Sequence, residues 1–95
     1  MLQIDFARHR VHLLDGMREV YLSPTEFRLL DVLVRNEGFV MSIDQLLDHV
    51  WGEDAVTREN VRQYISYLRR KLHAQSTNLI ETVKEFGYRY NALNR

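Results

Sequence analysis

The sequence TRENVRQYISYLRRKLH, residues 57–73, decides how the rest of the chain is interpreted. On a helix at about 100° per residue, it places four aliphatic side chains on one stripe, with Tyr64 at its edge. The stripe consists of Val61, Ile65, Leu68 and Leu72. The opposite face carries Glu59, Arg62, Gln63, Ser66, Tyr67 and Arg70, and the flanks carry Arg58, Arg69 and Lys71. The pattern predicts a helix that buries one face and offers donors suited to base edges and phosphates on the other.

An ordinary amphipathic helix with a solvated basic face would show the same pattern, so the distribution of charge along the chain matters. The formal net charge is zero, but it is divided unevenly. Residues 1–56 contain five Lys/Arg and ten Asp/Glu, a net charge of −5. Residues 57–95 contain eight Lys/Arg and three Asp/Glu, a net charge of +5. Basic charge concentrated on one helix and the segment after it is typical of a nucleic-acid-binding surface.

The composition is that of one small globular domain. A chain of 95 residues buries roughly 65% of its unfolded surface on folding. Because there is no cysteine, disulfides, thiolate zinc sites and cysteine nucleophiles are excluded. No apolar run approaches the roughly 18 residues of a membrane span, and the N-terminus lacks a signal-peptide pattern. We therefore expect a soluble, cytoplasmic protein.

Residues 2–22 predict a small antiparallel sheet of three or four short strands, because apolar residues recur at every second position. Asp15-Gly16 is a strong hairpin signal, since both central positions of such a turn favour a positive φ. A sheet of this size is marginal alone and must pack on helices.

Two further helices are expected before residues 57–73. Ser23, Pro24 and Glu26 form the start signal of the first, which should end near Asn36. Residues 39–41 are expected to form at most one brief strand.

Ser42 begins the second helix by the same capping logic. Trp51 closes it as a core residue, and residues 51–56 form the loop that follows. Thr57 then caps the third helix, so that the second and third helices have the proportions of a helix-turn-helix.

Residues 79–90 predict a final hairpin. Its strands are 79–83 and 87–90, joined around Lys84-Glu85-Phe86. Lys84 at the tip and Arg89 on the return strand make the hairpin a second candidate contact. The chain is therefore expected to be a single α+β domain consisting of a sheet, three helices and a hairpin.

Three segments carry a resemblance to a known family: LSPTEFRLLDVLVRNEGFVMSIDQLLDHVW, then ENVRQYISYLRRKL, then LIETVKEFGYRY. In this order and spacing they resemble the DNA-binding effector domain of OmpR/PhoB-type response regulators, over nearly the whole chain. The resemblance implies a winged helix-turn-helix with an N-terminal four-stranded sheet, three helices and a C-terminal hairpin wing. It also implies binding of double-stranded promoter DNA for transcription regulation, usually as head-to-tail pairs on direct repeats.

Carried over to this chain, the resemblance implies that the third helix enters the major groove and the hairpin around Lys84 touches the minor groove. The loop of residues 51–56 matches the segment through which some members contact RNA polymerase. Two positions depart from the family pattern. Arg62 stands where members usually have Asp, and Lys84-Glu85 stands where they usually have Arg-Gly. Members also carry an N-terminal receiver domain, which is absent from this chain, so we expect an excised domain or a stand-alone regulator.

The candidate contacts fall into four groups. Base contacts are expected from Arg62, Gln63, Ser66 and Arg70, since arginine pairs with guanine, glutamine with adenine, and serine is permissive. Backbone contacts are assigned to Arg58, Tyr67, Arg69, Lys71 and Thr82, with intramolecular ion pairs as the alternative for the three cations. The wing contributes Lys84 and Arg89, with a salt bridge as the alternative for Arg89. Glu53 and Asp54 are the candidates for a polymerase-binding surface.

Other functions are less well supported. His9 and His12 fall on opposite faces of a strand and lack a third ligand, so no metal or cofactor is expected. No Ser/His/Asp constellation indicates an enzyme. The alternatives are a winged-helix protein-interaction module, suggested by the zero net charge, and binding of double-stranded RNA, whose deep, narrow major groove would not admit the helix.

Overall fold

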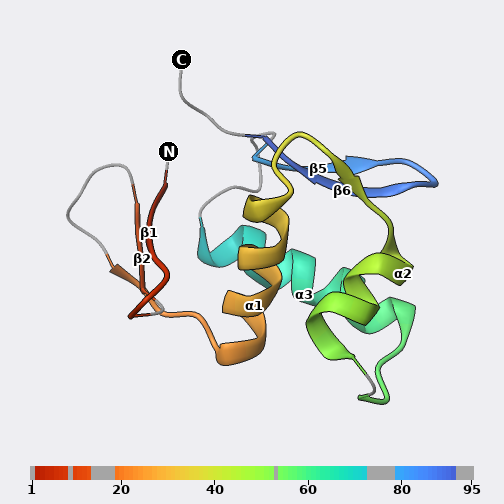
Figure 1. Cartoon of the computed structure of the whole chain (residues 1–95), viewed down its shortest axis with the longest axis horizontal. Coiled ribbons are helices and arrows are strands. Elements are labelled where there is room, and N and C mark those ends of the chain that lie inside the picture. The colour runs from red at the N-terminus through yellow and green to blue at the C-terminus, as the bar shows by residue number, and fades with distance from the viewer. Residues whose placement is uncertain (1, 9, 14–18, 53, 73–78, 92–95) are drawn as a thin grey trace.

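The computed structural model describes residues 2–8, 10–13, 19–52, 54–72 and 79–91. In chain order the elements are β1 (Leu2–Asp5), β2 (Arg10–Leu13), β3 (Glu19–Val20), α1 (Pro24–Arg35), β4 (Val40–Met41), α2 (Ile43–Leu46), the π-helix η1 (Leu47–Trp51), α3 (Arg58–Lys71), β5 (Ile80–Val83) and β6 (Gly87–Tyr90). Figure 1 shows the N-terminal strands at one end of the long axis and the tip of the β5–β6 hairpin at the other. The chain is a winged helix-turn-helix, as predicted.

The N-terminal sheet is antiparallel, with the strand order β1-β2-β3. Val11 of β2 lies opposite both Ile4 and Val20, and it is fully buried. The period-two pattern therefore turns its apolar face toward the helices. Three strands lie within the described residues, whereas the resemblance implied four, and the predicted turn at Asp15-Gly16 lies outside them.

A second antiparallel sheet has the strand order β4-β6-β5. The brief strand expected in residues 39–41 is confirmed as β4, whose Val40 and Met41 lie opposite Arg89 and Tyr88 of β6. Since β4 contains only two residues, it pairs with the root of the hairpin and leaves the tip without a third strand. The wing is thus held at one end only.

All three predicted helix starts are confirmed, and each has a reciprocal capping box. In each box the capping hydroxyl accepts a hydrogen bond from the backbone N–H three residues on, and that residue's side chain accepts one from the cap's own N–H. The pairs are Ser23 with Glu26, Ser42 with Gln45, and Thr57 with Asn60. These caps set where α1, α2 and α3 begin, and so they fix the direction in which α3 projects its faces.

The second helix differs from the expected uniform α-helix. After one α-helical turn it continues as η1, and the N–H of Gly52 donates to the carbonyl of Leu47, five residues earlier, at 2.9 Å. Gly52 has φ +62°, which ends the helix. The wider turn places Trp51 in the core, 8% exposed, with its ring 5.3 Å from the ring of Tyr64 in α3. The predicted core role of Trp51 is confirmed.

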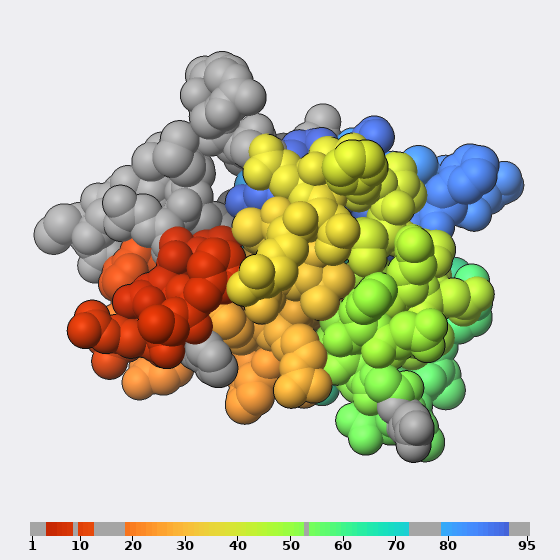
Figure 2. Space-filling model, viewed as in Figure 1, coloured from red at the N-terminus to blue at the C-terminus, as the bar shows by residue number. Residues whose placement is uncertain are grey.

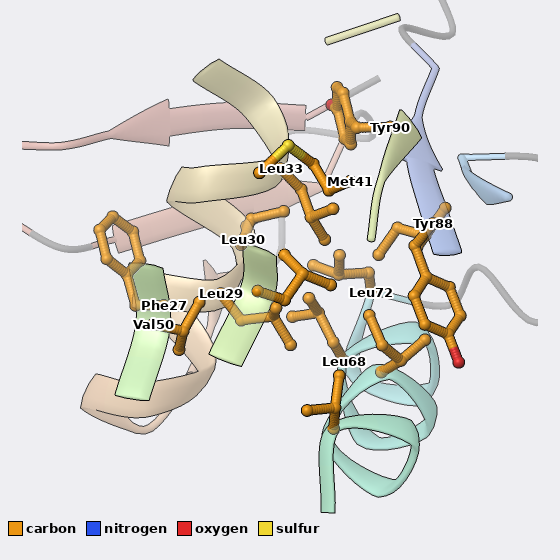
Figure 3. Packing of buried hydrophobic residues seen from close by; sticks show 14 of the residues in the cluster. Phe27, Leu29, Leu30, Leu33, Met41, Val50, Leu68, Leu72, Tyr88 and Tyr90 are labelled. Atoms are coloured by element: carbon orange, nitrogen blue, oxygen red, sulfur yellow. The ribbon is translucent and has the colours of Figure 1, made fainter. Parts of the chain in front are cut away.

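The core joins the helices to the hairpin. Figure 3 shows side chains of α1, α3 and β6 converging, among them Leu30, Leu68 and Tyr88. The four aliphatic residues of the α3 stripe are all at most 4% exposed. Burial of side chains of this size contributes about 1.5–3 kcal/mol each, so α3 is held firmly against α1 and the wing root.

Candidate nucleic-acid interface

The outer face of α3 is presented as predicted. Its buried stripe faces the core, and all six residues expected on the opposite face are exposed: Glu59, Arg62, Gln63, Ser66, Tyr67 and Arg70. The helix contains 14 residues, which corresponds to a length of about 21 Å. A rod of this length and width fits the major groove of B-DNA, which is about 12 Å wide.

Weak contacts connect neighbouring side chains on this face. The Arg62 Nη1 lies 3.4 Å from the Glu59 Oε1, and the Asn60 Nδ2 donates to the Gln63 Oε1 at 3.3 Å. The Arg70 guanidinium lies 5.9 Å from the ring centroid of Tyr67. Exposed contacts of this kind are typically worth less than about 1 kcal/mol. Because these contacts are weak, the side chains can exchange these partners for a ligand.

Arg58 forms a short but exposed ion pair. Its Nη1 lies 2.6 Å from the Asp44 Oδ1 at the start of α2, and both side chains are more than half exposed. The pair links the two helices of the helix-turn-helix. Because it is open to solvent, it does not prevent Arg58 from meeting a phosphate.

Arg69 is tied to the wing. Its Nε and Nη2 donate to the carbonyl of Ile80 at 3.0 and 2.6 Å, and Nη2 also donates to the Thr82 Oγ1 at 2.7 Å. Its guanidinium lies 5.8 Å from the ring centroid of Tyr88. Arg69 therefore fixes β5 against α3, which is an intramolecular role of the kind weighed as the alternative to phosphate binding.

Lys71 is tied to α1. Its Nζ lies 2.6 Å from the Oε1 of Glu26, a carboxylate that is only 5% exposed and also accepts the Ser23 N–H. Burial alone would raise the pKa of Glu26, but the hydrogen bonds from Lys71 and Ser23 and the charge of Lys71 lower it overall. The carboxylate therefore holds the end of α3 and the start of α1 together while ionised.

The wing has an ordered root and an exposed tip. At the root, the Arg89 Nη2 lies 3.0 Å from the Glu81 Oε1, so the predicted salt-bridge alternative for Arg89 is confirmed. Hydrogen bonds from Asn91 and Arg89 lower the pKa of Glu81. At the tip, Lys84, Glu85 and Phe86 are exposed, and Figure 2 shows the tip projecting beyond the body of the molecule.

Gly87 determines how closely the wing root approaches β4. Its φ is +152°, and a Cβ atom at this position would lie 2.0 Å from the carbonyl oxygen of Met41. Only glycine fits, since no other residue lacks the Cβ atom.

A groove of about 460 Å³ separates the wing from α3 and the start of α2. Arg58 and Arg62 line the helical side, while Thr82, Lys84 and Phe86 line the wing side. Sequence reasoning identified the cations but did not place them around one groove, and it did not assign Phe86 to the site. The available signal for Phe86 was an aromatic residue inside a charged turn segment.

Comparison with known proteins agrees with this geometry. The family model described as "Transcriptional regulatory protein, C terminal" matches residues 17–90. The chain belongs to this family. The phosphate regulon transcriptional regulatory protein PhoB of Rhizobium meliloti (strain 1021) is 43% identical over 89 residues, which cover 92% of this chain and 38% of that protein. The chain thus spans well under half of this relative's length. The family consists of transcription regulators and not of enzymes.

Solved structures of family members share the fold. The DNA-binding domain of Bacillus subtilis CssR has a TM-score of 0.83 and 28% identity, and the match covers 95% of this chain and 99% of that chain. The Klebsiella pneumoniae RstA DNA-binding domain, solved in complex with the RstA box, has a TM-score of 0.80 and 35% identity. That match covers 95% of this chain and 90% of the RstA chain.

One departure from the family pattern has a structural consequence at the wing. Glu85 replaces the usual glycine, and its φ is +72°, in the left-handed region that costs a non-glycine residue about 1–2 kcal/mol. The wing turn keeps the backbone that a glycine would adopt freely, but with an acidic side chain at the tip. The other departure, Arg62, lies on the outer face of α3 beside Glu59.

The remaining candidates lie on the loop after η1. Asp54 is exposed, and its N–H donates to the Trp51 carbonyl at 3.0 Å, whereas Glu53 lies outside the described residues. His9, one of the two histidines weighed for metal binding, lies outside them as well. The described ranges contain no cluster of three or more His, Asp or Glu side chains that could bind a metal ion. Among the helices of the described segments, none is long and apolar enough to cross a membrane.

Proposed function

We propose that the chain binds double-stranded promoter DNA in a sequence-specific manner to regulate transcription, with α3 in the major groove and the β5–β6 wing at the adjacent minor groove. The observation that carries this proposal is the groove between α3 and the wing, which has cations on both sides. A DNA backbone that separates the major from the minor groove would pass between the two elements. The RstA domain, similar in fold and 35% identical, was solved on its DNA box.

The roles of the residues on α3 follow from their exposure and partners. Arg62, Gln63, Ser66 and Arg70 are proposed to contact bases, because their side chains project from the outer face. Arg58 is proposed to bind a phosphate, since its partner Asp44 is exposed. Tyr67, beside Arg70, is proposed to pack on the sugar-phosphate backbone.

Two of the flanking cations are better explained as supports. Arg69 bonds to β5 and Lys71 to a buried carboxylate, so we infer that both position the interface and do not bind phosphate. Thr82 accepts a bond from Arg69 and is exposed on the wing beside the groove, which supports a backbone contact. At the wing, Lys84 is proposed to approach the minor groove, while Arg89 holds the hairpin through Glu81.

Further partners are proposed from the family. Members usually bind as head-to-tail pairs on direct repeats, and we propose the same for this chain in the cytoplasm. The exposed Asp54 on the loop after η1 is the proposed contact to RNA polymerase, together with Glu53.

Selection of binding sites from a random duplex pool tests the proposal. It should recover a defined sequence and, for paired binding, two copies in direct orientation at a fixed spacing. A salt titration on the selected site should show the logarithm of the affinity falling linearly with the logarithm of the salt concentration, with a slope of about −0.9 for each phosphate neutralised. Absence of DNA binding at low salt would contradict the proposal and would favour the protein-interaction module.

A further inference from the structure

We propose that Phe86 is a nonpolar minor-groove contact of the wing, with its ring against deoxyribose next to the segment read by α3. This inference rests on the proposed function, because it assumes that the wing meets DNA. It adds a contact that depends on apolar surface and not on charge.

Phe86 is exposed although it lies in an ordered turn. The side chain is 70% exposed at the hairpin tip, although its own N–H is bound to the Val83 carbonyl at 2.9 Å in an ordered turn. Transfer of apolar surface from water is favourable, so an exposed phenylalanine contributes little to folding and retains most of its ring surface for a ligand.

The neighbours of Phe86 indicate which ligand would cover it. Phe86 lines the same groove as Arg58 of α3, which is proposed to bind a phosphate, and Arg62, which is proposed to contact bases. When a phosphate backbone lies in this groove, the wing tip faces the minor groove beyond it. The walls of the minor groove consist of deoxyribose, and many minor-groove proteins insert phenylalanine or other apolar side chains into this groove, often between base steps.

The charges at the tip support a nonpolar contact. Lys84 and Glu85 are adjacent and of opposite sign, so the tip has almost no net charge with which to attract a phosphate backbone. Relative to the usual Arg-Gly pattern, the acidic residue weakens the electrostatic contact. Phe86 supplies affinity of a kind that Glu85 does not oppose.

The test compares five single variants on the selected DNA site, by fluorescence anisotropy at several salt concentrations: Phe86→Ala, Phe86→Leu, Lys84→Ala, Phe39→Ala and Arg70→Ala. Phe86→Ala should weaken binding about fivefold to tenfold at every salt concentration, since the lost contact is apolar area. Lys84→Ala should also weaken binding, but with a log–log salt slope that is smaller by about 1. Phe86→Leu should retain most of the affinity, because it keeps an apolar side chain.

Phe39→Ala is the matched control, because Phe39 is equally exposed, at 72%, and does not line the groove. It should bind as wild type does. Footprinting supplies a second readout. With hydroxyl radicals, which attack deoxyribose, Phe86→Ala should lose protection of minor-groove sugars. With dimethyl sulfate, which methylates guanine N7, the major-groove protection expected from Arg70 should remain.

Two results would overturn the inference and leave the proposed function intact. One is a Phe86→Ala variant that binds as tightly as wild type while Arg70→Ala is impaired. The other is an equal loss of affinity in Phe86→Ala and Phe39→Ala, which would indicate a nonspecific effect. Absence of DNA binding by the wild-type chain would instead contradict the proposed function itself.

Discussion

Arg69 and Arg70 are neighbours in the sequence, yet they belong to two different regions of the molecule. Arg69 donates to the backbone of β5 and is half-buried, whereas Arg70 lies on the exposed face over Tyr67. The same division applies to the other Lys and Arg residues of positions 57–95 that the structure describes. The inward cations are Arg69, Lys71 and Arg89, each bonded to another structural element or strand. The outward cations are Arg58, Arg62, Arg70 and Lys84, whose side chains are exposed.

The difference shows that positive charge alone does not define the binding surface. An inward cation offsets the burial of a carbonyl or carboxylate, so its removal should lower the free energy of unfolding. An outward cation has only weak partners, so its removal should lower DNA affinity and leave folding nearly unchanged. The two regions are therefore separable by experiment.

The largest effect is expected at the wing root, where the inward cations Arg69 and Arg89 form their bonds. In Gly87→Ala the new Cβ would collide with the Met41 carbonyl, forcing β6 away from β4. We expect a loss of at least about 3 kcal/mol in the free energy of unfolding. Gly38→Ala is the control, since Gly38 also has a positive φ, +84°, but a Cβ added there meets no atom within 4 Å, and it should cost only about 1–2 kcal/mol. Urea unfolding measures both, and equal losses would refute the close contact at the root.

The neighbouring arginines provide the sharpest comparison. Arg69→Ala leaves the buried Ile80 carbonyl without its donor and should cost about 1–3 kcal/mol of stability. Arg70→Ala should leave stability within about 0.5 kcal/mol of wild type and weaken specific DNA binding by about 1–3 kcal/mol, with relaxed preference at one base pair. Thermal unfolding and binding to the selected site should therefore rank the variants in opposite order. The same order in both measurements would remove the distinction between inward and outward cations.

The sequence predicted the elements but not this division. Local signals sufficed for the caps and for the buried stripe of α3, because each depends on residues within one or two turns. The partner of Arg69 lies 11 residues away on β5, and that of Lys71 lies 45 residues away on α1. Flank positions on a helix are buried or exposed according to what packs beside them, which periodicity does not report.

Backbone geometry was the other source of missing information. In the widened turn of η1 the backbone N–H donates to the carbonyl five residues earlier and not four. The spacing of apolar residues in the sequence does not distinguish this turn from an ordinary α-helix. The positive φ of Glu85 was likewise invisible from propensity, since glutamate rarely adopts it. The family pattern did contain a signal, because glycine is the usual residue at that position.

A pH titration tests the inward ion pair between Lys71 and Glu26. The pKa of Glu26 is lowered in the folded chain from an ordinary value of 4.5, so its ionised form is the one that stabilises the fold. This contribution is fully present above the unfolded pKa and is lost as the pH falls through the folded pKa. Glu26→Gln should thus reduce stability by about 1–2 kcal/mol at neutral pH and by less at pH 3. Chemical unfolding across this range measures the difference between the variants, and parallel curves would contradict the role of the ionised pair.

The smallest effect is expected at Glu85, an exposed residue that has both a strained backbone, with φ +72°, and a negative charge. Glu85→Gly should relieve the left-handed backbone and raise stability by about 0.5–1 kcal/mol, after the greater entropy of glycine in the unfolded chain is subtracted. Glu85→Ala keeps the positive φ and should leave stability nearly unchanged. Both variants remove the negative charge beside Lys84, so both should bind DNA about twofold to fivefold more tightly at low salt, with the gain shrinking at high salt.

Together, Glu85→Gly and Glu85→Ala separate the effect of backbone strain from the effect of the negative charge, which one substitution alone would not. Thermal unfolding should show a higher stability for Glu85→Gly than for Glu85→Ala. The DNA affinities of the two variants should be equal at each salt concentration. If only Glu85→Gly improved affinity, the geometry of the turn and not its charge would limit the wing contact. If neither did, the tip would not meet the phosphate backbone at all, and the outward region would end at the helical side of the groove.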